Sequence, residues 1–503
     1  MLPSTYPRLW IVVSVCVLLL GHAGGSVAAA DRSASASFQE AAVMFPSGPI
    51  TLAGSLLTPT TPGPHPAVVV VHGARPNARA PYRNFALQTF VQHGVAVLIY
   101  DKRGYGASTG KAGDASLSDL ADDVSAAVRY LQSRTEIDPT RIGLQGDSQA
   151  GWIMPLAATR TPAIAFLVMV SASAVSPAQQ EAWSMEQQLR RAGLSEQTVD
   201  TGRKARRLLD DYAAAVRAGR LPTIGALQAV TSLDTGYNPV PILERITQPM
   251  LIFLGEADPI VPTKHSAAVF DAALRKAGNR DYTIIVYPGA NHGIQVPTTN
   301  AEGQTTLGYV AGYRDTMTNW VVGHVRGRAT PPQGVQGSAA IDPAFGAGGP
   351  YGPPSWGGSA AVQVPLLVLF ALVFGSAPVV LGSRAIAARR PRRNRTRTIS
   401  AGARRARRAG IIGSLWLLGM LVGMVALIAA LLLGGAADVP RQIRIVVIVL
   451  GVVSTLTSLN MAAKAYQAWK NGYWSLVERG YYTLVAVVAL VFVPFLVYWR
   501  MLG

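Results

Sequence analysis

The residues best suited to chemistry in this sequence are Ser148, Asp258 and His292, which occur in that order and each follow an apolar, strand-like run. A serine hydroxyl is a poor nucleophile until an imidazole accepts its proton, and a carboxylate fixes the tautomer and orientation of that imidazole. Each of the three alone could be an ordinary turn residue, and Glu256 is an alternative acid. Their combination indicates nucleophilic catalysis by serine, with His292 as the base and Asp258 as the orienting acid.

Ser148 lies in the segment Gly-Asp-Ser-Gln-Ala, residues 146–150, between a strand-like run and an apolar, helix-like run. On such a sharp turn the serine hydroxyl is exposed beside the free N–H groups of the helix N-terminus; a serine that simply caps the helix is the alternative. The pattern Gly-x-Ser-x-Gly is met with one departure, Ala150 in place of the second glycine. We expect the backbone N–H groups of Gln149 and Ala74 to hold a developing oxyanion, because Ala74 follows a His-Gly turn at another strand end.

Near-continuous runs of Val, Ile and Leu alternate with amphipathic, helix-like stretches in residues 38–327, for example the helix predicted over 117–133. This alternation predicts an α/β fold with a mostly parallel sheet. Ligands of such sheets bind at the carboxyl ends of the strands, where the candidate residues lie. The predicted strands are Ala67–His72, Val95–Asp101, Arg141–Gly146, Ile164–Ser171, Met250–Gly255 and Tyr282–Tyr287.

Three further segments match a known family: Val-Val-His-Gly at 70–73, Tyr-Asp-Lys-Arg-Gly-Tyr-Gly-Ala-Ser at 100–108 and Ile-Asp-Pro-Thr-Arg-Ile-Gly at 137–143. With the serine turn and the order of the candidate residues, residues 38–327 resemble serine hydrolases of the α/β-hydrolase superfamily. Within it they are similar to the dienelactone hydrolases, prolyl-oligopeptidase-like enzymes and acyl-thioester hydrolases. The resemblance implies an α/β-hydrolase fold and a Ser-His-Asp triad. No Cys/His cluster in the sequence suggests a metal, and we expect no cofactor.

The expected reaction is cleavage of a small-molecule carboxylic ester through an acyl-enzyme. A short peptide is an alternative substrate, since the same triad cleaves amides, so an aminopeptidase-like enzyme stays open. In a different class, the domain could be a catalytically idle binding or scaffolding module. Residues 175–245, rich in helix formers and charge, are interpreted as a helical cap that sets substrate size and entry.

The net charge of +18 is a local feature. Residues 1–360 hold 28 basic and 25 acidic side chains, whereas residues 384–408 hold eleven Arg and no acid. The basic composition therefore gives no reason to expect a nucleic-acid partner. The apolar share of 50% excludes a disordered chain.

The Arg-rich segment 384–408 lies between very apolar stretches, an arrangement typical of a multi-pass membrane protein. An apolar leader, residues 1–30, is interpreted as a signal peptide, and a Gly/Pro-rich tether covers 328–360. Because Arg-rich loops stay in the cytoplasm, we expect a plasma-membrane protein whose hydrolase-like region faces outward. Gly419 and Gly423 form a Gly-x-x-x-Gly pair, a pattern typical of helix–helix self-association, with ordinary glycines as the alternative. The predicted transmembrane helices are 362–383, 410–434, 442–460 and 481–499.

Overall fold

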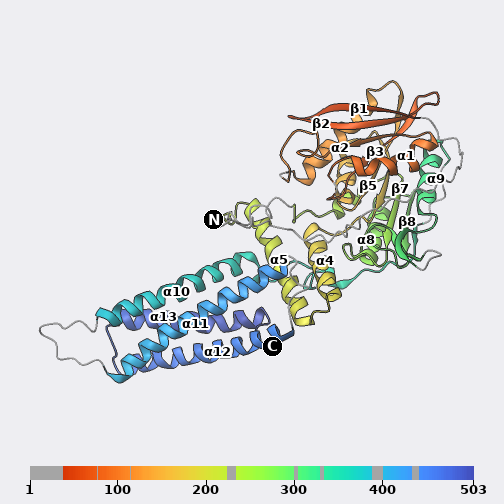
Figure 1. Cartoon of the computed structure of the whole chain (residues 1–503). Coiled ribbons are helices and arrows are strands. Elements are labelled where there is room, and N and C mark those ends of the chain that lie inside the picture. Colours follow the sequence, from red (N-terminus) through yellow and green to blue (C-terminus); the bar gives the residue numbers. More distant parts are fainter. Residues whose placement is uncertain are drawn as a thin grey trace, which may run out of the picture. The chain divides into compact units, whose positions relative to one another are not determined.

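A computed structural model of the chain divides into two compact units, each described here by itself (Figure 1). The α/β unit comprises the described parts of His22–Gln187 and Asp210–Pro353, and the helical unit those of Gln188–Leu209 and Pro354–Gly503. The predicted leader and residues 388–399 of the Arg-rich segment lie outside the described residues. The structure describes residues 38–75, 77–113, 115–223, 234–299, 304–328, 334–387, 400–432 and 441–502.

The α/β unit is built on one nine-stranded sheet, and all six predicted strands are present. The first two strands are antiparallel to their neighbours, and the remaining pairs are parallel, as expected for strands covered on both faces. In spatial order the strands are β1 (Phe38–Ser47), β2 (Ile50–Pro59), β4 (Ala96–Tyr100), β3 (His65–Val71), β5 (Ile137–Asp147), β6 (Ile164–Val170), β7 (Met250–Gly255), β8 (Tyr282–Tyr287) and β11 (Gly334–Gln336). This confirms the predicted α/β class with its mostly parallel sheet.

Helices cover both faces of this sheet, because successive strand residues point to opposite sides. Val69 packs in a core with residues of α2, α3 and α8, whereas Val68 and Val70 pack with residues of α1 and α9. The result is a three-layer α/β/α arrangement. The helices are α1 (Arg83–Thr89), α2 (Leu117–Gln132), α3 (Ala150–Arg160), α7 (Val240–Leu243), α8 (Thr263–Lys276) and α9 (Tyr313–Val325).

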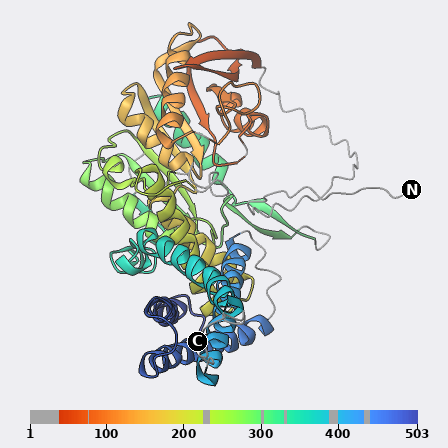
Figure 2. The same ribbon diagram turned by 90° about the vertical axis from the view of Figure 1, so that its left-hand side faces the viewer.

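A second, two-stranded sheet follows β8: β9 (Gln295–Thr299) pairs with β10 (Thr305–Tyr309). Figure 2 shows this hairpin standing apart from the main sheet. Between β6 and β7 the chain forms α4 (Pro177–Arg191) and α5 (Glu196–Arg217), so the insert is helical as its composition indicates. Its role as a cap over the site stays a prediction.

An ion pair fixes the loop that follows β4 to helix α2. Arg103 donates from Nε and Nη2 to the Asp123 carboxylate at 2.8 and 2.7 Å, and Asp123 is fully buried. The Ser47 hydroxyl donates to the same carboxylate at 2.6 Å. Burying a carboxylate is costly unless it is paired, so Arg103 stabilises the fold here.

The helical unit contains α10 (Ala360–Ala387), α11 (Ala401–Leu432), α12 (Arg441–Lys470) and α13 (Leu476–Tyr498). All four are long and apolar enough to cross a membrane, in agreement with the four predicted spans. Their shared core is aromatic: the ring centroids of Phe370 and Phe492 lie 4.9 Å apart. Large apolar side chains such as Leu372 and Val379 face outward, as in a bundle surrounded by lipid.

Residues 188–209 of the insert belong to the helical unit. The Thr201 hydroxyl donates to the Trp499 carbonyl at 3.3 Å, and Lys204 Nζ donates to the Tyr498 carbonyl at 2.9 Å. Ala205 is buried in the apolar core that the four helices share. The middle of the insert therefore packs with the helical unit.

Gly419 and Gly423 lie on the outer surface of α11, where an added Cβ would meet no described atom within 4 Å. They are not used for packing among the described helices of this chain. Self-association through this pair stays a prediction.

Replacing Arg103 by methionine is expected to lower the free energy of unfolding of the α/β unit by about 3–5 kcal/mol, because Asp123 would stay buried without its partner. Thermal unfolding of the full chain, followed by circular dichroism, measures this. Arg129→Met, at the exposed end of the same helix, is the control and should cost less than about 0.5 kcal/mol. The double variant Arg103→Met/Asp123→Leu should recover part of the loss, and equal effects of the two arginine variants would contradict this role.

Candidate active site

Ser148 occupies the turn between β5 and α3 in a strained backbone conformation. Its φ of 53° lies in the left-handed region, which a side chain other than glycine rarely adopts. Its N–H donates to the Val170 carbonyl of the neighbouring strand at 2.8 Å, and its carbonyl accepts from Gly151 at 2.9 Å. This is the geometry expected of a serine held out at a sharp strand-to-helix turn.

The residues that flank the turn are small because the chain approaches itself closely there. A Cβ on Gly146 would lie 2.6 Å from both the Ala150 methyl group and the Val71 carbonyl oxygen. A Cβ on Gly151 would lie 2.4 Å from the Ala172 methyl group. Ala150 itself is fully buried. The departure from Gly-x-Ser-x-Gly is thus accommodated, since Gly146 leaves room for the alanine methyl group.

His292 and Asp258 lie together in the loops that follow β8 and β7. His292 Nδ1 is 2.7 Å from Asp258 Oδ2, and the Asp258 side chain is fully buried. The other carboxylate oxygen, Oδ1, accepts from the N–H groups of Ile260 at 2.7 Å and Val261 at 3.1 Å. Asp258 is therefore oriented from one side by the backbone and from the other by the imidazole.

The alternative acid, Glu256, does not meet the imidazole. Its carboxylate is partly exposed and lies 3.2 Å from Lys264 Nζ. The loop of His292 has a support of its own, because the Ser171 hydroxyl at the end of β6 donates to the His292 carbonyl at 2.7 Å. Of the two candidate acids, Asp258 is the one positioned to orient His292.

Opposing effects act on the pKa of the His292 imidazole. Burial lowers it, whereas the hydrogen bond and the negative charge of Asp258, with the further charge of Asp147, raise it. Burial is the largest single effect, but the raising effects together outweigh it, so the pKa lies above the ordinary value of 6.5. The Asp147 contribution also indicates that His292 lies near the turn of Ser148. Among the described residues Ser148 Oγ makes no hydrogen bond to His292, a contact that is often long before a substrate binds.

The His-Gly-Ala segment after β3 lies against the same turn. A Cβ on Gly73 would lie 3.3 Å from the Ser148 Cβ and 2.5 Å from an Asp147 carboxylate oxygen. The backbone after β3 therefore touches the turn directly before Ala74. Gln149, the other expected donor, stands at the N-terminus of α3, where backbone N–H groups are free of helical partners.

Sequence reasoning missed Lys102, a buried cation between these two segments. Its ammonium group donates to the Gly73 carbonyl at 2.5 Å and to the Gln149 side-chain oxygen at 2.8 Å. Burial lowers the pKa of Lys102 to about 8, against the raising effect of the Asp147 charge. Lys102 comes directly after β4, so the rule that strand ends carry function could have identified it.

Asp147 and His72 are two further buried titratable groups beside the turn. Burial raises the pKa of the Asp147 carboxyl group, while the charges of His292 and Lys102 oppose that shift. The Tyr82 hydroxyl donates to Asp147 at 3.3 Å. The His72 ring stacks on that of Tyr82 at 4.3 Å, and burial lowers its pKa to about 3, so this imidazole is neutral near pH 7. His72 thus packs beside the site as an uncharged aromatic ring.

No group of three or more His, Cys, Asp or Glu side chains in the described ranges is placed to hold a metal ion. The arrangement of Ser148, His292 and Asp258 needs only protein groups for nucleophilic attack and proton transfer.

Comparison with known proteins identifies a family that this part of the chain matches. Residues 62–297 match the family described as "Serine aminopeptidase, S33". The quorum-quenching protein AidA of Acinetobacter baumannii is 33% identical over 110 residues, which cover 22% of this chain and 36% of that protein. The chain thus spans about a third of the length of this relative. An uncharacterized 31.7 kDa protein of Escherichia coli is 24% identical over 225 residues, or 41% of this chain and 78% of that protein.

Among solved structures, the α/β hydrolase GrgF of Penicillium sp. sh18 is 18% identical with a TM-score of 0.39, covering 58% of this chain and 99% of that one. The sheet order and the family match together identify the fold. Residues 62–297 are therefore an α/β-hydrolase domain that matches the serine aminopeptidase S33 family, in a chain with four helices long and apolar enough to cross a membrane.

Proposed function

We propose that the chain is a membrane-anchored serine hydrolase that cleaves carboxylic esters through an acyl-enzyme intermediate. The observation that carries this proposal is the 2.7 Å contact between His292 Nδ1 and the buried Asp258 carboxylate. Both residues follow parallel strands, so they lie at the same edge of the sheet as the strained turn of Ser148. Ser148 is half-buried, and an imidazole oriented by a buried carboxylate can accept the proton of such a serine and make it nucleophilic.

The reaction begins with attack of Ser148 Oγ on the ester carbonyl carbon while His292 accepts the hydroxyl proton. The carbonyl oxygen becomes an oxyanion, which the backbone N–H groups of Gln149 and Ala74 stabilise. Collapse of this intermediate breaks the ester C–O bond; the leaving alkoxide oxygen takes the proton from His292 and departs as the alcohol, and Ser148 stays acylated. A water molecule then attacks the acyl group with His292 as its base, and the carboxylic acid and free serine are released.

Lys102 acts in this reaction as a positioning residue. Its ammonium group joins the Gly73 carbonyl, directly before Ala74, to the side chain of Gln149. The two backbone N–H donors thus belong to segments that one cation holds together. Preorganised donors cost no reorganisation when the oxyanion forms, and removing one such donor lowers turnover by about 10²–10³-fold in well-studied cases.

An aminopeptidase is the second candidate function, and the description of the matching family favours it. The same nucleophile and base would cleave an amide, with the leaving amine taking the proton from His292. Rates on p-nitrophenyl acetate and on a panel of aminoacyl p-nitroanilides distinguish the two. A higher kcat/KM on the anilides would assign the peptidase.

We propose further that the four helices lie in the plasma membrane and that the hydrolase domain is on its extracytoplasmic side. This placement is supported by the eleven Arg between the first two spans, since short basic loops are retained in the cytoplasm. Cysteine labelling with a membrane-impermeant reagent tests it, using a cysteine introduced at exposed Arg129. Self-association through Gly419 and Gly423 belongs to the same proposal and is tested by crosslinking in the membrane.

Replacing Ser148 by alanine is expected to lower kcat for p-nitrophenyl acetate by about 10⁶-fold, the loss seen when a serine nucleophile is removed elsewhere. A fluorophosphonate probe should label the wild-type chain at Ser148 and leave the variant unlabelled. Ser133→Ala, which changes an exposed serine at the C-terminal end of α2 before β5 begins, is the control. Equal rates in wild type and Ser148→Ala would favour an idle binding module instead.

The pH profile of kcat/KM should have an acid limb above pH 6.5, because only the neutral His292 imidazole accepts a proton and its pKa is raised. Asp258→Asn removes the hydrogen bond and the charge that raise this pKa, so the limb should move to lower pH. The same change should lower kcat by about 10⁴-fold through loss of the correct tautomer. Glu256→Gln is the matched control and should leave both quantities unchanged; the opposite pattern would identify Glu256 as the acid.

The pH profile of kcat should also fall on its alkaline side near pH 8, where Lys102 loses its proton and its charge. Lys102→Met should lower kcat by about 10- to 100-fold and abolish this alkaline limb, with little change in KM. Lys111→Met, which removes an exposed lysine from the following loop, is the control. An unchanged alkaline limb in Lys102→Met would show that the charge of Lys102 plays no part in turnover.

A further inference from the structure

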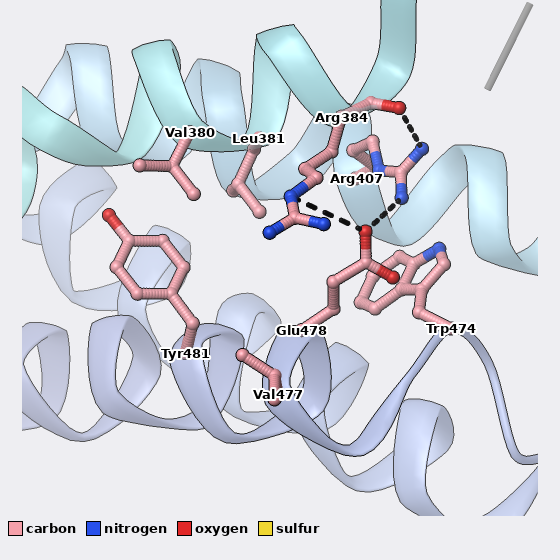
Figure 3. A pocket seen from close by; sticks show the side chains of 8 residues that line it. All are labelled: Val380, Leu381, Arg384, Arg407, Trp474, Val477, Glu478 and Tyr481. Carbon is pink, nitrogen blue, oxygen red and sulfur yellow. Dashed lines mark hydrogen bonds and ion pairs between the residues drawn. The ribbon is translucent and has the colours of Figure 1, made fainter. Parts of the chain in front are cut away.

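The helical unit contains a cavity of about 150 Å³ between the C-terminal end of α10 and the N-terminal parts of α11 and α13. Figure 3 shows its polar wall, which Arg384, Arg407 and Glu478 form, beside the ring of Trp474. The volume matches that of an engineered protein cavity that admits benzene, so a small ionic group fits inside. The hydrolase site is in the other unit, so this cavity has no part in the chemistry described above.

Positive charge exceeds negative charge in the polar wall. A single carboxylate oxygen, Glu478 Oε1, lies 3.4 Å from Arg407 Nη2 and 4.0 Å from Arg384 Nε. The second oxygen, Oε2, already accepts from the backbone N–H of Ser475 at 3.2 Å. One carboxylate therefore pairs with two guanidinium groups, both at long distances. These three side chains leave the wall with a net charge of +1.

Hydrogen-bond donors in this wall lack acceptors within the described part of the chain. Arg407 is only 8% exposed, yet its Nε meets no acceptor, and the same holds for the buried indole N–H of Trp474. The terminal nitrogens of Arg384 point into the cavity in Figure 3; this side chain is 55% exposed, and within the described residues its one ion-pair contact is the 4.0 Å approach to Glu478. Buried donors without partners are rare in folded proteins, so these two leave positive potential in the wall that no described acceptor offsets.

The opposite wall is apolar. Val380, Val477 and Tyr481 lie on the side of the cavity away from Arg407 in Figure 3. Val477 is 74% exposed on the outer surface of the bundle, so this wall continues to the face that lipid would cover. A ligand that enters from that face meets apolar side chains first and the guanidinium groups behind them.

We propose that this cavity binds the phosphate group of an anionic phospholipid at the end of the bundle that carries the Arg-rich segment. The phosphate oxygens accept from the terminal nitrogens of Arg384, the positive charge of Arg407 behind them adds attraction, and the glycerol and first acyl carbons lie along Val477 and Tyr481. Guanidinium groups suit phosphate because their planar array of donors matches its oxygens. Basic residues at the ends of transmembrane helices attract anionic lipid in the same way. The apolar wall favours a lipid over free phosphate as the source.

Lipid binding is tested by native mass spectrometry of the full chain in detergent, titrated with phosphatidylglycerol. We expect one tightly bound lipid per chain and at least about tenfold weaker binding by Arg384→Gln, the loss of one charge-assisted contact. Arg405→Gln is the matched control: it removes the same charge from an exposed position of α11 outside the cavity. Equal weakening by both arginine variants would overturn the site, because it would assign the binding to net charge alone.

A second pair of variants tests the apolar wall without a change in charge. Val477→Trp narrows the cavity and should weaken binding, whereas Leu476→Trp, exposed and outside the cavity, should not. Inorganic phosphate at 10-fold excess over the lipid should fail to displace it, and displacement would assign a free phosphate ligand and overturn the lipid. All four variants should retain ester hydrolysis, so failure of the lipid site and failure of the hydrolase are separate outcomes.

Discussion

The candidate site depends on how closely the chain approaches itself where β5 turns into α3. Ser148 keeps a left-handed backbone there only because neighbouring segments hold the turn: the Val170 carbonyl accepts its N–H, and Gly146 and Gly151 leave no room for larger residues. This strained conformation directs the serine out from the sheet, toward the segments that carry Ala74 and His292. The packing of β3, β6 and α3 against this one turn therefore determines whether the proposed nucleophile, base and oxyanion donors can meet.

Around this turn the protein buries groups that each cost free energy alone. Asp147, Lys102 and the His292–Asp258 pair lie within one polar cluster, so each charge lowers the cost of its neighbour. The consequence is a site whose parts are electrostatically linked: the charge of Asp147 raises the pKa of the imidazole and that of the ammonium group alike. Loss of any one charge would be felt by the others, so these residues are best regarded as a unit.

Much of the fold follows from the sequence, because strands covered on both faces carry uninterrupted Val, Ile and Leu runs. Three strands were not predicted. β1 is largely exposed and lacks such a run, the apolar run of β2 is interrupted by Gly54 and Ser55, and β11 is only three residues long. At the site, the types and order of the three candidate residues could be predicted. The choice between Asp258 and Glu256 depends on loop geometry that spacing alone does not determine, and the contacts of Lys102 join segments far apart in sequence. The packing of residues 188–209 with the helical unit was not predicted, because their charged, amphipathic sequence is equally typical of a solvated cap.

That packing has a consequence for the release of the enzyme from its anchor. Among the described residues the chain crosses between the two units at Gln187–Gln188, at Leu209–Asp210 and near Pro353. Three chain segments therefore connect the α/β unit to the helical unit. A protease that cuts only the Gly/Pro-rich tether would not shed a soluble domain, since the insert would still hold it to the helices. A chain terminated before α10 would leave Ala205 and Leu208 without the core against which they pack, exposing an apolar, aggregation-prone face.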